Sequence, residues 1–292
     1  MYKDGKHSLR KKKISIAIPA SVVSDTPHLR EKTSKIGLIG RTAAIFRIDE
    51  IIVYRDVLKE NQTAESDLIV TLLAYMETPQ YLRKRLFGLR PELRYAGILP
   101  PLRTPHHPLD RKIRNLKVGE YREGIILSKI HKGTLVDIGV EQPVLLLGEQ
   151  LPLGRRVTVK VMKVDKQVEV AMAERDEISE YWGYVVSFER RSLGKILKSH
   201  SFDLAIATSK YGVPFESIVE GIAEKWKKAQ TILIVFGAPS RGSYEIVKQE
   251  GLDLGDVTDF VTNTIPKQGA ETVRTEEAIT ASLAIFNVQF RF

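Results

Sequence analysis

The sequence predicts an α/β fold in which a parallel sheet is interrupted by a small inserted β-barrel. Strand-like apolar runs alternate with helix-like segments over the first hundred residues, and the same alternation returns from about residue 178. Between these two parts lie short alternating runs at close spacing, which are typical of a small barrel. Because the first pattern stops and then resumes, we expect a discontinuous α/β domain that carries an insertion.

The first hundred residues contain the first strands and helices of the α/β pattern. Residues 12–21 (KKISIAIPAS) alternate at Ile14, Ile16 and Ile18 and predict a strand that Pro19 ends. Asp25-Thr26-Pro27 predicts a helix start, and apolar residues at helical spacing continue that helix to Phe46. Residues 51–54 predict a short buried strand, and residues 63–76 and 79–86 predict two further helices.

The middle of the chain changes pattern twice. Residues 97–115 hold four prolines without periodicity, as in a linker or an extended crossing segment. Five strand-like runs follow within about 60 residues, and the OB-fold is the usual barrel of five strands. These runs are 121–130, 133–140, 143–147, 156–164 and 167–173. We therefore place the barrel at 116–175, with linkers at 101–115 and 176–177.

The α/β pattern then returns, so that residues 1–100 and 178–292 are predicted to form one domain. Strands are predicted at 184–188, 202–207, 231–236 and 258–264, and helices at 192–199, 214–229 and 270–288. The run TILIVF at 231–236 is apolar throughout, as expected for a strand covered on both faces.

The composition excludes several classes of protein. The chain has 292 residues and no cysteine, which excludes disulfides, thiolate metal sites and cysteine nucleophiles. No apolar run approaches the ~20 residues that cross a bilayer. The apolar stretch near the N-terminus is shorter than the ~7–15 residues of a secretory signal. We therefore expect a cytoplasmic protein without a membrane segment.

The net charge of +9 is concentrated in the N-terminal half. Residues 1–47 carry eleven basic and three acidic side chains, and residues 83–114 carry nine and two. Residues 176–292 have thirteen basic and sixteen acidic side chains, so this part is slightly acidic. Clustered positive charge favours a polyanion partner such as nucleic acid, although a solvated basic surface has the same composition.

Two loops follow apolar strands and lead into helices, at 237–242 and 265–278. Ligands bind at this position in open α/β sheets, although an ordinary strand-to-helix turn has the same sequence features. The chain lacks a G-x-G-x-x-G fingerprint and a P-loop, so the usual groups for nucleotide hydrolysis are missing. His106-His107 has no further ligands nearby, and we expect Trp182 and Trp226 to serve in packing.

These two loops resemble a known family of enzymes. Asn263–Asn287 and Val235–Gly242 are similar to the two C-terminal motifs of the SPOUT, or α/β-knot, methyltransferases. The start of the chain (13–56) and the segment LRYAGILPPLRTPHHPL (93–109) resemble an archaeal and eukaryotic branch of that family. This branch carries an OB-like barrel in the knot domain and is assigned as RNA uridine-N3 methyltransferases.

The resemblance implies a trefoil-knotted parallel-sheet domain, S-adenosylmethionine as cofactor, RNA (ribosomal RNA in the first instance) as partner, and a homodimer. The implied cofactor-binding residues are Thr208, Phe236, Gly237, Pro239, Gly242, Asn263, Ile265, Pro266, Gln268 and Gly269. A side chain at Gly269 is expected to clash or to require a strained φ. The implied dimer surface is the last helix, through Ile279, Leu283, Ile285, Phe286 and Val288, although an apolar helix face can equally belong to the core.

The proposed chemistry assigns roles to three further residues. Methylation at uridine N3 needs the N3 proton removed, and a cation against the uracil oxygens stabilises the anion that forms. Arg274 and Arg241 are candidates for that cation, and Glu276 or Glu277 for the base. The alternatives are a salt bridge for Arg274, a favourable helix first turn for the two glutamates, and a loop-capping role for Asn263.

Two other functions remain open at this point. The chain could be a non-catalytic RNA-binding or ribosome-assembly factor that keeps the knot as a scaffold. It could also act through protein interactions alone. Binding of S-adenosylmethionine separates both from the enzyme.

Overall fold

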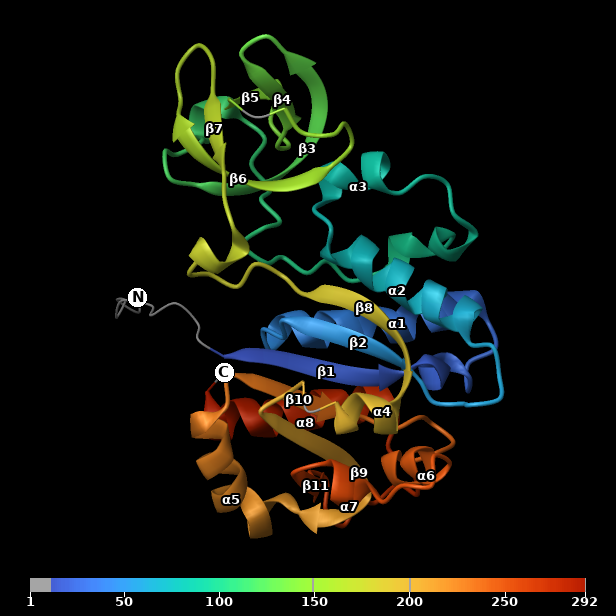
Figure 1. The fold of residues 1–292 in the computed structure, drawn as a ribbon. Helices are drawn as coiled ribbons and strands as arrows, with labels where there is room; N and C mark the ends of the chain where they lie inside the picture. Colours follow the sequence, from blue (N-terminus) through green and yellow to red (C-terminus); the bar gives the residue numbers. More distant parts are fainter. Residues whose placement is uncertain (1–11, 149, 200, 292) are drawn as a thin grey trace. The chain divides into compact units, whose positions relative to one another are not determined.

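The computed structural model describes residues 12–148, 150–199 and 201–291 (Figure 1). Part of the predicted basic N-terminal segment, residues 1–11, lies outside the described residues. Contacts divide the chain into two compact units. One comprises Glu77–Arg90 and Leu102–Gly183, and the other comprises residues 12–76, Pro91–Pro101 and 184–291. The domain limits at 100, 116, 175 and 178 stay predictions.

The second unit is built on a six-stranded sheet in which every pairing is parallel. The strand order is β11-β9-β10-β1-β2-β8. The strands are β1 (Lys13–Pro19), β2 (Glu50–Arg55), β8 (Val185–Ser192), β9 (Leu204–Pro214), β10 (Thr231–Val235) and β11 (Phe260–Asn263). The predicted α/β class and its parallel sheet are therefore confirmed.

Helices cover both faces of this sheet. They are α1 (Leu29–Ile45), α2 (Thr63–Glu77), α4 (Leu193–Lys198), α5 (Phe215–Lys228), α6 (Ser243–Lys248), α7 (Leu254–Val257) and α8 (Thr275–Phe290). Apolar residues of α4, α6 and α7 pack on one face, against Ala17, Tyr54 and Val235. The alternate residues Ile16 and Ile18 point to the other face and are equally buried, so a continuously apolar strand sequence is required.

The other unit contains the barrel and α3 (Gln80–Leu86). Its five strands are β3 (Tyr121–Ile130), β4 (Gly133–Asp137), β5 (Val144–Leu147), β6 (Arg156–Lys163) and β7 (Glu169–Met172). They close in the order β3-β4-β5-β7-β6, with β5 and β7 parallel and the other pairs antiparallel. The predicted five-stranded barrel is confirmed, and its arrangement fits an OB-like fold.

Two predicted elements begin or end elsewhere than expected. The first helix begins at Leu29 because the Asp25 carboxylate accepts two 2.8 Å hydrogen bonds from Lys35 Nζ instead of capping a helix. The last helix begins at Thr275. Its residues Ile279, Leu283 and Phe286 are fully buried within the chain, so the expectation that this face is available to a second copy was wrong for these three.

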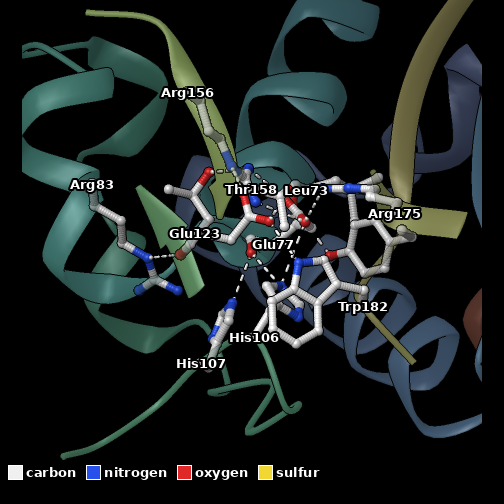
Figure 2. A network of polar contacts seen from close by, with 12 residues as sticks. Leu73, Glu77, Arg83, His106, His107, Glu123, Arg156, Thr158, Arg175 and Trp182 are labelled. Carbon is white, nitrogen blue, oxygen red and sulfur yellow. Dashed lines mark hydrogen bonds and ion pairs between the residues drawn. The ribbon is translucent and has the colours of Figure 1, made fainter. Parts of the chain in front are cut away.

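A buried charge network holds the barrel unit together (Figure 2). Arg156, at the start of β6, donates to Glu77 Oε2 (2.6 Å) and Oε1 (3.1 Å), and its Nε donates to Glu123 Oε2 (2.6 Å). Arg175 adds a 3.2 Å contact to Glu77. The indole of Trp182 donates to Glu123 Oε1 at 2.6 Å, which confirms a packing role for this tryptophan. Burying the carboxylates of Glu77 and Glu123 without a partner would be unfavourable. The guanidinium groups of Arg156 and Arg175 compensate for this cost by pairing with them.

The predicted linker joins this network through its two histidines. The ring Nε2 atoms of His106 and His107 each donate to the Glu77 backbone carbonyl, at 2.8 and 2.7 Å. Burial, followed by the charge of His106, lowers the pKa of His107 to about 4. Burial raises the pKa of Glu77, but the charges of Arg156, His106 and Arg175 outweigh it, so the net pKa is lowered. The fold is therefore less stable in acid: His107 destabilises it once the pH falls below the ordinary histidine pKa, and the stabilisation from the Glu77 carboxylate is lost as that group becomes protonated.

Within the part of the chain that is described, no helix combines the length and apolar character that crossing a membrane requires.

The first prediction concerns acid stability. Because the folded pKa of His107 lies below its unfolded value of about 6.5, the free energy of unfolding should fall between pH 6.5 and about 4. The slope from one such group is at most about 1.4 kcal/mol per pH unit. His107→Gln should reduce the change in the free energy of unfolding between pH 6.5 and about 4. The control His131→Gln, at an exposed position, should not reduce it. Urea titrations at several pH values test this, and parallel curves for wild type and His107→Gln would contradict it.

Candidate functional site

A cavity of about 240 Å³ lies where three neighbouring strands of the sheet end. Its walls come from the second half of β9, the loop after β10, and the segment that leads from β11 into α8. Nine of the residues singled out from the sequence line it, namely Thr208, Phe236, Gly237, Pro239, Arg241, Gly242, Asn263, Ile265 and Gln268. All parallel strands end at one edge, which brings these distant segments together.

Side-chain hydroxyls tie the three walls to one another. The Thr208 hydroxyl donates to the Val235 carbonyl (3.0 Å), and the Ser243 hydroxyl donates to the Thr208 carbonyl (3.3 Å). The Thr275 hydroxyl, at the start of α8, donates to the Gly237 carbonyl (3.2 Å). Backbone carbonyls of the cavity wall are therefore satisfied by buried hydroxyls, and the cavity shape is fixed before any ligand binds.

Tyr54, the penultimate residue of β2, supports the cavity from behind. Its hydroxyl donates to the Phe236 carbonyl at 2.7 Å, and both side chains are essentially inaccessible to solvent. Burial, and then the negative charge of Asp56, raise the pKa of the Tyr54 hydroxyl well above its ordinary value. The hydroxyl therefore stays protonated and remains a donor to the loop after β10.

The loop after β11 is held by its own side chains. Asn263 Oδ1 accepts from the Ile265 amide (2.9 Å), and Nδ2 donates to the Lys210 carbonyl (3.0 Å). Gln268 donates to the Ala270 and Glu271 carbonyls at 2.9 and 3.0 Å. The loop-capping alternative for Asn263 is thus what the structure shows, although its side chain also borders the cavity.

Gly269 differs from the sequence expectation. A Cβ at this position would meet no atom within 4 Å, and its φ lies outside the left-handed region. The residue of this loop with positive φ is Lys267, at 55°. The expected clash or strain at Gly269 is therefore absent from the free protein, and neither Gly269 nor Pro266 lines the cavity.

Gly237 is the position in the loops where a side chain does not fit. A Cβ there would lie 2.9 Å from the Ser243 amide nitrogen and 3.1 Å from the Gly242 Cα. Both neighbours are backbone atoms at the start of α6, so they cannot rotate away. This close approach explains a glycine directly after the buried strand β10.

Arg241 lines the cavity and forms an ion pair with the buried carboxylate of Asp56. Its Nη2 lies 3.5 Å from Asp56 Oδ2, and the Asp56 side chain is inaccessible to solvent. Ser21 donates to Asp56 through its amide (3.1 Å) and its hydroxyl (2.5 Å), and Gln62 donates through its side-chain amide (2.8 Å). The carboxylate is therefore fixed in orientation, and it restrains one end of the Arg241 guanidinium.

Arg274 and Glu276 lie in a different hollow. That hollow is lined by residues of α1 and its approach, among them Asp25 and Lys35, together with Arg274 and Glu276. Glu276 Oε2 is 3.3 Å from the buried Lys35 Nζ. The Glu277 carboxylate accepts from the Arg274 backbone amide at 3.0 Å, so Glu277 serves the first turn of α8. Of the three residues assigned to catalysis, Arg241 alone lines the cavity at the ends of β9, β10 and β11.

Several residues of this region were missed by sequence reasoning. Lys210, Tyr211 and Glu245 line the cavity, and Asp56 stands behind it. The signal for Asp56 was available, because it directly follows the buried strand residues 51–54 and so falls at the ligand-binding edge. Lys210 and Tyr211 lie in a polar segment of β9 that does not look like a strand.

The second prediction uses the two glycines of the loop after β10. Gly237→Ala should lower the free energy of unfolding by about 1–3 kcal/mol, because the new methyl group overpacks a backbone contact. Gly242→Ala should stay within about 0.5 kcal/mol of wild type, since a Cβ there meets nothing within 4 Å. Urea unfolding of the cofactor-free proteins measures both. Equal midpoints for Gly237→Ala and wild type would refute the close approach.

Comparison with known proteins agrees with this geometry. The profile of a family described as "Putative RNA methyltransferase" matches residues 13–286. An uncharacterised protein of Halobacterium salinarum is 34% identical over 284 residues, covering 92% of this chain and 96% of its own length. A 28S rRNA (uridine-N(3))-methyltransferase of Mus musculus is 31% identical, covering 93% of this chain and 75% of its own length. The Homo sapiens protein of the same name is 30% identical, with 93% and 77% covered. The match spans both the sheet and the barrel, and this chain therefore belongs to that family of RNA methyltransferases.

Proposed function

We propose that the chain transfers a methyl group from S-adenosylmethionine to N3 of a uridine in ribosomal RNA. The observation that carries this proposal is the cavity at the carboxyl edge of the sheet, in a chain of a methyltransferase family. Relatives about 30% identical over most of the chain are named for this reaction on 28S rRNA. The knot implied by the resemblance is part of the proposal, because strand order alone does not establish threading.

The lining residues suit S-adenosylmethionine in chemical type. Ile265 and Val273 offer apolar surface for a purine ring, and the hydroxyls of Ser209 and Thr272 offer partners for polar groups. Glu245 is the one carboxylate among the lining residues described. The cofactor supplies an electrophilic methyl group when bound. The protein contributes binding, orientation and the stabilisation of charge on the target base.

Arg241 is proposed as the cation that faces the target uracil. The N3 proton passes to solvent water, which leaves negative charge on the two uracil oxygens, and a nearby guanidinium lowers the energy of that anion. Asp56 is a positioning residue in this scheme, because it touches Arg241 and lies buried behind the cavity. Glu276 forms an ion pair with Lys35, which supports a structural role for Glu276 within one chain. Because its carboxylate is engaged in this pair, Glu276 is less suited to removing the N3 proton.

The position of RNA on the two units follows only in part from charge. Lys12 donates to the carbonyls of Trp226, Lys227 and Ala229, and Lys13 pairs with Glu50 at 3.1 Å. These two charges of the N-terminal segment are therefore engaged within the protein. In residues 83–114, Arg85 pairs with Asp137, whereas Arg111 and Lys112 are exposed. We propose that the latter segment contributes to RNA binding.

A homodimer remains part of the proposal on the strength of the resemblance. The last helix offers less surface than expected, since Val288 is exposed and Ile285 is half-buried. The packed neighbour of α8, helix α1, adds Leu38 and Ile45, which are 53% and 55% exposed. These two residues are seven apart and so share a helix face.

The third prediction separates the enzyme from a non-catalytic scaffold. Calorimetry of the full chain with S-adenosylmethionine should show saturable binding at one site per chain, because the cavity is already formed by internal hydrogen bonds. Incubation with ribosomal RNA from a strain that lacks the protein should then yield a methylated uridine by mass spectrometry. An absence of binding at millimolar cofactor would instead favour an RNA-binding or assembly factor.

The fourth prediction is a double-mutant cycle on Asp56 and Arg241. Arg241→Ala should lower the single-turnover methylation rate by ~100-fold with little change in cofactor affinity. Asp56→Asn should lower the rate by roughly 10-fold in the wild-type background, and should add little to Arg241→Ala because it acts through that residue.

The control for this cycle is Asp203→Asn. Like Asp56, Asp203 accepts three hydrogen bonds, here from the backbone amides of Gln230 and Thr231 and from the Thr231 hydroxyl, but it precedes β9 at the amino edge of the sheet. Asp203→Asn should leave the single-turnover methylation rate unchanged. Independent, additive losses from Asp56→Asn and Arg241→Ala would show that Asp56 does not act through Arg241.

A further inference from the structure

We propose that Tyr211, together with Lys210, forms a platform at the mouth of the cavity on which an unpaired base of the RNA stacks. This inference rests on the proposed function and names how the same site holds its substrate. It starts from exposure, since Tyr211 is 71% exposed while it lines the cavity. Among the aromatic side chains of the described residues, only Tyr211 is exposed.

The ring is accompanied by a cation. Lys210 Nζ lies over the Tyr211 ring, 5.1 Å from its centroid. Lys210 is itself a lining residue of the cavity. An aromatic face and an adjacent positive charge match the two features of single-stranded RNA, its bases and its phosphates. A ring of this kind accepts any base, because every base has a flat face.

The platform is held rigidly, although it lies at the surface. Gly212, the next residue, approaches the neighbouring chain so closely that a Cβ would lie 2.6 Å from the Thr262 carbonyl carbon. The Lys210 carbonyl accepts the 3.0 Å hydrogen bond from Asn263, and the Tyr211 amide donates to Ser209 Oγ at 3.2 Å. The backbone of the platform is thus fixed to β11 before RNA arrives. Preorganisation of this kind reduces the entropic cost of binding.

The barrel offers no comparable surface. Of the residue types phenylalanine, tyrosine and tryptophan, residues 116–175 contain one, Tyr121, whose ring is half-buried and packs against Trp182 with the ring centroids 6.2 Å apart. The described barrel can therefore contact RNA through charge and backbone, but it does not present a free ring. Of the aromatic residues that line the cavity, Tyr211 is the exposed one, so it is the ring on which we expect an unpaired base to stack.

The adenine of the cofactor is the competing partner for this ring. The inner surface of the cavity already offers the half-buried side chains of Ile265 and Val273. When S-adenosylmethionine fills the interior of the cavity, the exposed ring of Tyr211 still faces solvent. The next molecule to arrive from solvent is the RNA, so the RNA is the partner that meets this ring. The observations thus favour RNA, and an experiment with both ligands decides between them.

The experiment compares Tyr211→Ala, Tyr211→Leu and Tyr211→Phe in the full chain. Binding of a fluorescein-labelled oligouridylate is measured by anisotropy, and binding of S-adenosylmethionine by calorimetry. Tyr211→Ala should raise the Kd for RNA by about 10- to 100-fold, which is the usual effect of losing one stacked base. Tyr211→Phe should retain wild-type affinity, and Tyr211→Leu should resemble alanine because it lacks an aromatic face. Cofactor affinity should stay unchanged in all three.

The matched control is Val185→Ala, at another exposed apolar position, which should change neither affinity. Thermal unfolding verifies that the variants fold, as expected for an exposed side chain. Wild-type RNA affinity in Tyr211→Ala would overturn the platform, and weaker cofactor binding with normal RNA binding would assign the ring to adenine. If the wild-type protein itself bound no RNA, the proposed function would fail together with the platform, which is a different result from failure of the platform alone.

Discussion

Every feature of the candidate site depends on the parallel pairing of the six strands. Parallel strands all end at the same edge, so segments near residues 54, 208, 237 and 263 meet there although they are far apart in sequence. The sheet is buried on both faces, and its strands are accordingly rich in isoleucine, valine and leucine. Polar chemistry is thereby excluded from the body of the sheet and confined to the loops at this edge.

The edge is cross-linked by buried polar side chains. Tyr54 and Asp56 are two residues apart at the end of β2, and both reach the loop after β10, from which β2 is separated by β1. Tyr54 donates a hydrogen bond to the Phe236 carbonyl, and Asp56 restrains Arg241. The loop therefore has support from a rigid strand rather than from its own sequence, which is how catalytic groups are generally held in place.

The sequence predicted the order and type of elements well where periodicity was clear. The limits predicted for β3 coincide with those observed, and the other barrel strands are displaced by a few residues. The prediction was too short for β9, which continues through Thr208–Pro214, because a polar segment with a glycine lacks the strand pattern. Helices α6 and α7 were missed, since each has at most six residues and too few turns to show a period.

The candidate site was predictable to a similar degree. A strand-edge rule and a family resemblance located nine lining residues, since both concern loops. Local sequence does not reveal which residues meet across the fold. It therefore missed the contact of Asp56 with Arg241 and the pairing of Glu276 with Lys35. The open position of Gly269 was missed for the same reason, because glycine in a loop has several possible causes.

The position of the barrel within the chain has a consequence for biosynthesis. The central strand β1 pairs with β10, so that Ile14 lies beside Ile232, and the sheet cannot close until most of the chain has been made. The barrel strands, by contrast, are contiguous from Tyr121 to Met172 and pair among themselves. Such local pairings form quickly, whereas distant parallel pairings form slowly. During translation the barrel is therefore expected to fold on the ribosome first, while β1 and β2 await the strands that complete their sheet.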